Sequence, residues 1–120
     1  MEETNIVDIT EQQGTTVVSF KAASISNAEQ IEAVGKSVKA YIEKNKPKRM
    51  VFDFEGVKFF SSQLLGLLLD IRVRMEAGNG ELVISAINPQ LYRVFKITNL
   101  KKVFEFFPDR GSAIIGKSSN

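Results

Sequence analysis

Two adjacent serines, Ser61 and Ser62, stand in the segment VKFFSSQLLG at residues 57–66. A strand-like apolar run ends just before them, and a leucine-rich run with helical spacing begins just after them. The first amides of a helix lack intrahelical partners and carry partial positive charge, so a serine hydroxyl there can cap the helix or carry a phosphate. Ser61 is the better candidate for the cap, and Ser62 for the modified surface hydroxyl.

A phosphate on Ser62 would act on a binding partner rather than on the fold. It would bring about two negative charges and a bulky group into any contact surface over the helix. The helix itself would tolerate the phosphate, because its free amides favour an anion. The alternative is a plain cap with no modification, which is the more frequent role of a serine at such a position.

Other chemistry is limited by the composition, since the 120 residues include neither cysteine nor histidine. This excludes a thiol nucleophile, a Ser-His-Asp triad and the usual type of zinc site. The phosphate-binding patterns GxxxxGK[ST] and GxGxxG are also missing. We therefore expect no catalytic residue, no metal site and no cofactor, and we expect that the protein is not an enzyme. Asp53, at a strand end, is expected to have a structural role.

The charge pattern argues against nucleic acid as a partner. The net charge is +2, and basic residues gather at 44–49 and at Lys101 and Lys102 without interleaved aromatic residues. Cations at 44–49 suit the C-terminus of a helix. No apolar run approaches the roughly 20 residues that span a bilayer, and the acidic, polar start is unlike a signal peptide. We expect a cytoplasmic protein without membrane insertion.

The periodicity predicts an α/β domain over residues 1–120. Ser26 with Glu29 has the form of a capping box for the first helix, and Asn27 is a rival cap. Right-handed crossovers would make the later strands parallel. The prediction is a mixed, mostly parallel sheet of about five strands with an N-terminal hairpin, covered by about four helices. The expected strands are 5–12, 15–20, 49–56, 81–87 and 102–107, and QQG at 12–14 is the expected turn of the hairpin, where Gly14 can adopt positive φ. The expected helices lie within 24–45, 62–77, 88–100 and 108–115, and Asn88 is the expected cap of the third.

The helix at 62–77 is expected to bury one apolar stripe and to expose its other side. The stripe consists of Leu64, Leu65, Leu68, Ile71 and Met75. The opposite side carries Gln63, Gly66, Asp70 and Arg74. Leu67 lies towards that exposed side, where it is either a contact residue or the edge of the core.

Residues 51–107 resemble a STAS domain, the fold of bacterial anti-sigma-factor antagonists. That family reads approximately as a strand with Asp, then Gly-Val-x-Phe-hydrophobic, then Asp-Ser-x-Gly-Leu-Gly and a leucine-rich helix. The matching positions are Asp53, Gly56, Val57, Phe59, Leu65 and Gly66, followed by GELVI, FKITNL and VFEFF. Ser61 stands at the family's Asp position and Leu64 at its first Gly position. Leu64 then lies either near the docking surface or in the core stripe.

The resemblance implies an anti-sigma-factor antagonist. The unphosphorylated form would bind an anti-sigma factor, a serine kinase of the GHKL type, and release the sigma factor. Phosphorylation of Ser62, with Ser61 as the alternative acceptor, would break that contact, and a serine phosphatase would restore it. The implied docking surface consists of Lys58, Phe60, Ser61, Ser62, Gln63, Gly66 and Leu67. The changed Asp and Gly positions favour an alternative, an adaptor without phosphorylation in a lipid-transport ABC system or a signalling scaffold.

Overall fold

The computed structural model describes residues 6–116, which build a five-stranded mixed sheet. The strand order is β1-β2-β4-β6-β7, with β1 and β2 antiparallel and the other neighbours parallel. A separate parallel pair joins β3 to β5. The strands are β1 (Val7–Gln12), β2 (Thr15–Phe20), β3 (Ser24–Ile25), β4 (Arg49–Asp53), β5 (Phe59–Phe60), β6 (Glu81–Ser85) and β7 (Glu105–Phe107). The helices are α1 (Ala28–Asn45), α2 (Ser62–Ala77), α3 (Pro89–Ile97) and α4 (Arg110–Ile115).

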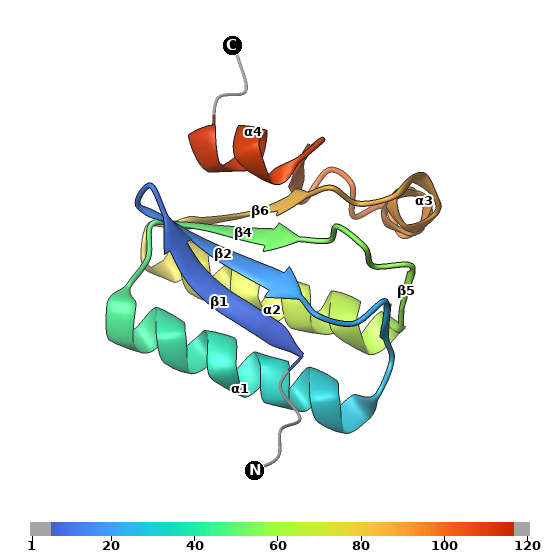
Figure 1. Ribbon diagram of the computed structural model, residues 1–120, viewed down its shortest axis with the longest axis horizontal. Coiled ribbons are helices and arrows are strands. Elements are labelled where there is room, and N and C mark those ends of the chain that lie inside the picture. The colour runs from blue at the N-terminus through green and yellow to red at the C-terminus, as the bar shows by residue number, and fades with distance from the viewer. Residues whose placement is uncertain (1–5, 117–120) are drawn as a thin grey trace.

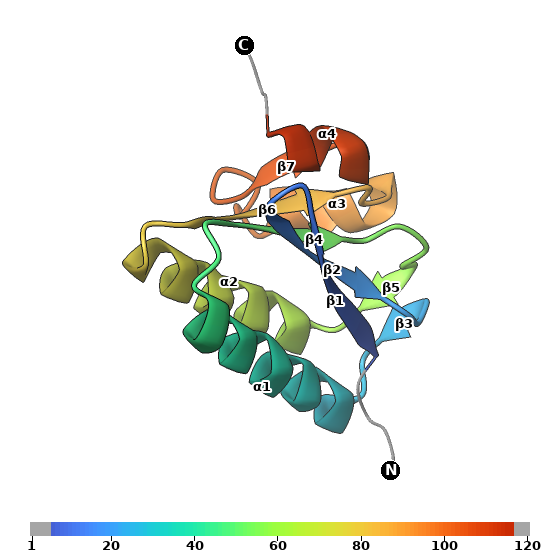
Figure 2. The same ribbon diagram turned by 60° about the vertical axis from the view of Figure 1, so that its left-hand side comes forward.

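The two long helices, α1 and α2, lie side by side against one face of the sheet, and the short α4 lies over the other face (Figures 1 and 2). Neighbouring residues on the central strands therefore enter different clusters, because successive strand side chains point to opposite faces. The cluster shared with α1 and α2 contains Val18, Phe52 and Ile84. The cluster shared with α4 contains Val17, Val51, Val83, Phe107 and Ala113. This arrangement confirms the predicted α/β fold.

The N-terminal hairpin turns within the predicted QQG segment, with two residues, Gln13 and Gly14, between β1 and β2. Gln13 and Gly14 both adopt positive φ, at 54° and 79°. A turn with positive φ at both central residues matches the right-handed twist of the strands, and glycine adopts this conformation without steric cost. The hairpin places β1 at the edge of the sheet and leaves β2 to pair with β4.

The helices α1 and α3 begin after asparagine caps. Asn27 Oδ1 accepts the Gln30 N–H at 2.9 Å, so Asn27 caps α1 and the predicted capping box at Ser26 is wrong. Asn88 Oδ1 accepts the Leu91 N–H at 2.8 Å and caps α3, as predicted. None of the helices in the described part of the chain is long and apolar enough to cross a membrane.

Asp53 joins three elements of the scaffold at the carboxyl end of β4. Its side chain is almost fully buried, and Oδ1 accepts the Ser85 hydroxyl at 3.0 Å. Oδ2 accepts the Arg110 Nε–H at 2.9 Å. A buried carboxylate needs such partners, because an unpaired buried charge is costly. The contacts fasten β4 to β6 and α4, which fits the structural role that we expected for Asp53.

Candidate partner-docking and modification site

The start of α2 is held in place by the short β3–β5 pair. Ile25 pairs with Phe60, and the Ser61 N–H donates to the Ile25 carbonyl at 3.0 Å. Three residues earlier in the chain, the Lys58 N–H donates to the Ala23 carbonyl at 2.7 Å. These bonds fix the entry into α2 against the segment that enters α1. The sequence did not reveal this pair, because two-residue strands show no periodicity.

Ser61 occupies the N-cap position of α2, but its hydroxyl does not make the predicted cap. Its backbone is extended, with φ −87° and ψ 166°, and its carbonyl accepts the Leu64 N–H at 3.0 Å. Its Oγ is buried and has no hydrogen-bond partner. Because strand pairing with Ile25 still holds the residue, the hydroxyl is covered by protein instead of bonding to the helix amides. The prediction of a side-chain cap at Ser61 is therefore wrong.

Ser62 is the first residue of α2 and is exposed. It lies at the positive end of the helix dipole. The first turn of α2 carries no acidic residue, so no carboxylate of that turn would repel an added phosphate. Of the two serines, Ser62 thus presents the accessible hydroxyl in an environment that favours an anion.

Lys58 is exposed, as expected, whereas Phe60 is not. The Phe60 side chain is only 6% exposed, and its ring packs against Phe54 and Phe95 at centroid distances of 5.7 and 5.9 Å. Phe59 is 52% exposed instead. The prediction placed the wrong phenylalanine at the surface, because alternation along β5 turns one ring inward and the next outward.

Helix α2 buries the apolar stripe that the sequence predicted. Leu64 is 0% exposed, so its side chain lies in the core and not near the docking surface. This settles the two alternatives for the residue at the family's first Gly position. The other buried members are Leu65, Leu68, Ile71 and Met75.

A groove of about 600 Å³ runs between α1 and the exposed side of α2. It is lined on α2 by Gln63, Gly66, Leu67 and Asp70, and on α1 by Ile31, Glu32, Gly35, Lys36 and Lys39. Three residues of the predicted docking surface, Gln63, Gly66 and Leu67, therefore share this groove with residues of α1. The sequence did not reveal the contribution of α1. The one available signal was Gly35, a glycine inside a helix.

Leu67 is half-buried and packs across the groove onto α1. A Cβ added at Gly35 would come within 3.0 Å of Leu67 Cδ1, so the glycine allows the two helices to approach. Leu67 thus belongs to the edge of the core, one of the two alternatives that the sequence left open.

An ion pair fastens the middle of the two helices. Lys39 Nζ lies 2.7 Å from Asp70 Oδ2, and Arg74 Nε lies 3.6 Å from Asp70 Oδ1. The hydrogen bond from Lys39 is the main cause that lowers the pKa of Asp70 below its ordinary value, and Arg74 adds to it. The Asp70 carboxylate thus pairs with both cations, of which Lys39 lines the groove.

Gly66 lies in the interior of α2, and no neighbouring atom lies close enough to require a glycine there. A Cβ added there would meet no heavy atom within 4 Å. We expect Gly66→Ala to raise the free energy of unfolding by about 0.5–1 kcal/mol, since alanine loses less backbone entropy in a helix. Urea unfolding followed by circular dichroism measures the change. Gly35→Ala is the matched control and should gain less or lose stability, because Leu67 must move; equal gains would contradict the close helix contact.

Comparison with known proteins places this architecture in a family. A family model of the STAS domain matches residues 7–113. An anti-sigma-factor antagonist (STAS) domain protein from Planctomyces limnophilus superposes with a TM-score of 0.84 at 22% identity, covering 94% of this chain and 98% of that chain. The anti-sigma factor antagonist SpoIIAA in its unphosphorylated form gives 0.72 at 18% identity, covering 92% and 96%. The phosphorylated form of SpoIIAA, from Bacillus, gives 0.72 at 19% identity, covering 92% and 97%. With a shared fold and a family match over most of its length, the chain belongs to the STAS domain family.

Proposed function

We propose that the chain is an anti-sigma-factor antagonist whose binding is switched by phosphorylation of Ser62. The observation that carries the proposal is the difference between the two serines: Ser62 is exposed at the start of α2, whereas Ser61 Oγ is buried. Membership of the STAS family supports it, and so does the likeness to an antagonist that exists in a phosphorylated form.

In the unphosphorylated state, the surface at the start of α2 docks on the anti-sigma factor and frees the sigma factor. The surface is polar except for an exposed aromatic ring, and it is nearly free of charge apart from one lysine. Its exposed members in the described chain are Lys58, Phe59, Ser62, Gln63 and Gly66. Aromatic residues, phenylalanine included, are enriched in protein interfaces.

The modification is a phosphoryl transfer in which this chain is the substrate. The Ser62 oxygen forms a bond to the γ-phosphorus of ATP held by the kinase, the bond from that phosphorus to the ADP oxygen breaks, and the hydroxyl proton passes to a base of the kinase. A phosphatase later hydrolyses the ester with water. The chain itself catalyses neither step and needs no cofactor.

The phosphate changes the interface without unfolding the domain. It lies at the amide end of α2, where an anion is favoured. Any partner surface packed over Ser62 must then accept about two negative charges in a contact that excluded water. The partner therefore dissociates while the core below, including Leu64, remains packed.

Phosphopeptide mapping tests the acceptor. The chain is incubated with ATP and the GHKL-type serine kinase that co-purifies with it from its native host, and the product is analysed by mass spectrometry. We expect one phosphate on Ser62, none in Ser62→Ala, and full labelling in the matched control Ser61→Ala. Phosphate on Ser61, or in Ser62→Ala, contradicts the proposal. Co-purification of an ABC-type ATPase in place of a kinase, without phosphate, supports the adaptor alternative instead.

A further inference from the structure

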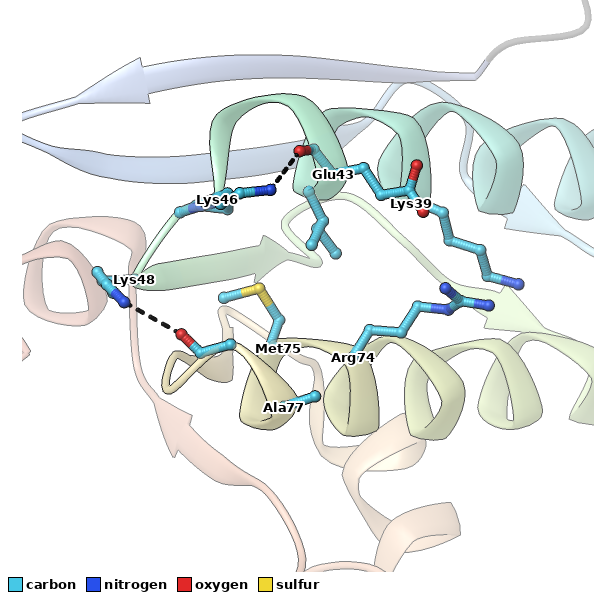
Figure 3. A pocket seen from close by; sticks show the side chains of 10 residues that line it. Lys39, Glu43, Lys46, Lys48, Arg74, Met75 and Ala77 are labelled. Carbon is cyan, nitrogen blue, oxygen red and sulfur yellow. Dashed lines mark hydrogen bonds between the residues drawn. The ribbon is translucent and has the colours of Figure 1, made fainter.

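A second concavity lies at the opposite end of α1 and α2 from Ser62. It has a volume of about 310 Å³ and opens where α1 ends, β4 begins and α2 turns into β6 (Figure 3). Its volume is at the lower end of the range for small-molecule sites. The proposed partner docking uses none of the residues that line this pocket, which we call the end pocket.

The backbone around the end pocket is tightly packed. A Cβ added at Gly80 would come within 3.0 Å of both Met75 Cε and the Pro47 carbonyl oxygen, so the turn after α2 lies directly against the segment that enters β4. The Gly80 N–H donates to the Met75 carbonyl at 2.7 Å, and the Glu81 N–H donates to the Lys48 carbonyl at 3.0 Å. The pocket is therefore preformed by fixed backbone and not by a mobile loop.

The interior of the end pocket is apolar. Met75 is 1% exposed, and the partly buried Ile42 packs against the same core. Pro47 and Ala77 complete the apolar lining. Such a surface favours the hydrocarbon part of a ligand, because burying apolar surface away from water is favourable.

Cations surround this apolar interior. Figure 3 shows Lys46 and Lys48 on one side of the pocket, Lys39 and Arg74 on the other, and Met75 between them. Both ammonium groups on the first side are held by backbone oxygens: Lys46 Nζ donates to the Glu43 carbonyl at 2.9 Å, and Lys48 Nζ to the Gly78 carbonyl at 3.1 Å.

These backbone bonds orient the two ammonium groups without neutralising them, and each ammonium has further N–H donors. The C-terminal ends of α1 and α2 carry only a partial negative charge, so they offset only part of the positive charge of the two lysines. On the other side, Lys39 and Arg74 share the carboxylate of Asp70. Glu43 is the single carboxylate among the described residues that line the pocket. The cations therefore outnumber the anions around an apolar interior.

We propose that the end pocket binds a small organic anion, a carboxylate with an apolar body of about six carbons. The hydrocarbon lies on Ile42, Pro47 and Ala77, above the buried Met75, and the carboxylate accepts from Lys48 and Lys46. Charge complementarity excludes a cationic ligand of the same shape, and the apolar interior disfavours a bare inorganic anion. The inference concerns a different surface from Ser62 and does not depend on the proposed function.

Titration with hexanoate, followed by NMR of the Met75 and Ile42 methyl groups, tests the pocket. We expect saturable shifts with a Kd of about 1 mM, an affinity ordinary for a ligand of this size. Hexylammonium, which carries the opposite charge on a hydrocarbon one carbon longer, should cause no saturable shift. 1-Hexanol should bind at least threefold more weakly than hexanoate, in line with the strength of exposed charge pairs. Shifts centred on Ser62, no saturation, or equal binding of the alcohol would overturn the proposal.

Charge variants test which side chains recognise the anion. Lys48→Gln should weaken hexanoate about three- to fivefold, and Glu43→Gln should strengthen it by a similar factor, because one removes an attraction and the other a repulsion. Lys44→Gln is the matched control, since Lys44 lies nearby in the last turn of α1 but does not line the pocket. If Lys44→Gln and Lys48→Gln weaken hexanoate binding equally, the effect comes from the overall charge of the protein, and the assignment of Lys48 is wrong.

Discussion

Leu64→Ala is expected to lower the free energy of unfolding by about 3 kcal/mol, a large part of the stability of a domain of this size. Leu64 is 0% exposed and belongs to the cluster between α2 and the sheet. Removing its branched end leaves a cavity that the neighbours fill only in part. Urea unfolding monitored by circular dichroism measures the loss.

Leu67→Ala is the matched control on the same helix. Leu67 is only half-buried, and its side chain packs against α1 at the edge of the core. Leu67→Ala should therefore lower the free energy of unfolding by about 1 kcal/mol. Losses of equal size at the two positions would contradict the placement of Leu64 in the core. Leu64→Gly, which restores the family's glycine, should cost about 1 kcal/mol more than Leu64→Ala. In this chain the departure from the family pattern thus serves packing.

Long periodic segments were predictable from the sequence. The stripe from Leu64 to Met75 predicted α2 and the face that it buries, since about three turns of regular apolar spacing leave little choice of face. The hairpin turn at Gly14 and the cap at Asn88 followed from local backbone chemistry, which depends on only a few neighbouring residues.

Features that depend on contacts distant in sequence were not predictable. Phe59 and Phe60 differ in exposure because β5 pairs with β3, a segment more than thirty residues earlier. The same pairing covers the Ser61 hydroxyl, so a residue with the right type for a cap does not make one. The α1 side of the groove was missed because the packing of Leu67 on Gly35 appears only when both helices lie on the sheet. Sequence reasoning thus found the exposed serine at the start of α2 but not the surface around it.

Ser62→Asp is expected to separate stability from binding. The added carboxylate lies in the first turn of α2, where a negative charge is favourable by about 0.3–1 kcal/mol, so the free energy of unfolding should stay equal or rise. Under the proposed function, affinity for the anti-sigma kinase should fall about 100-fold, because the charge must be buried in the contact without a partner. Isothermal titration calorimetry with the purified kinase measures the affinity.

Two control variants show whether the loss of affinity in Ser62→Asp depends on the position and on the added charge. Ser62→Ala removes the hydroxyl without adding charge and should bind within about threefold of the unmodified chain, since few contact residues carry much of the binding energy. Val73→Asp places the same charge on an exposed residue of the same helix, outside the docking surface, and should also bind normally. If Val73→Asp weakens binding as strongly as Ser62→Asp, the loss reflects net charge and the docking surface lies elsewhere. If Ser62→Asp binds normally although it is folded, a charge at the start of α2 does not switch the partner, and the phosphorylation switch must be abandoned.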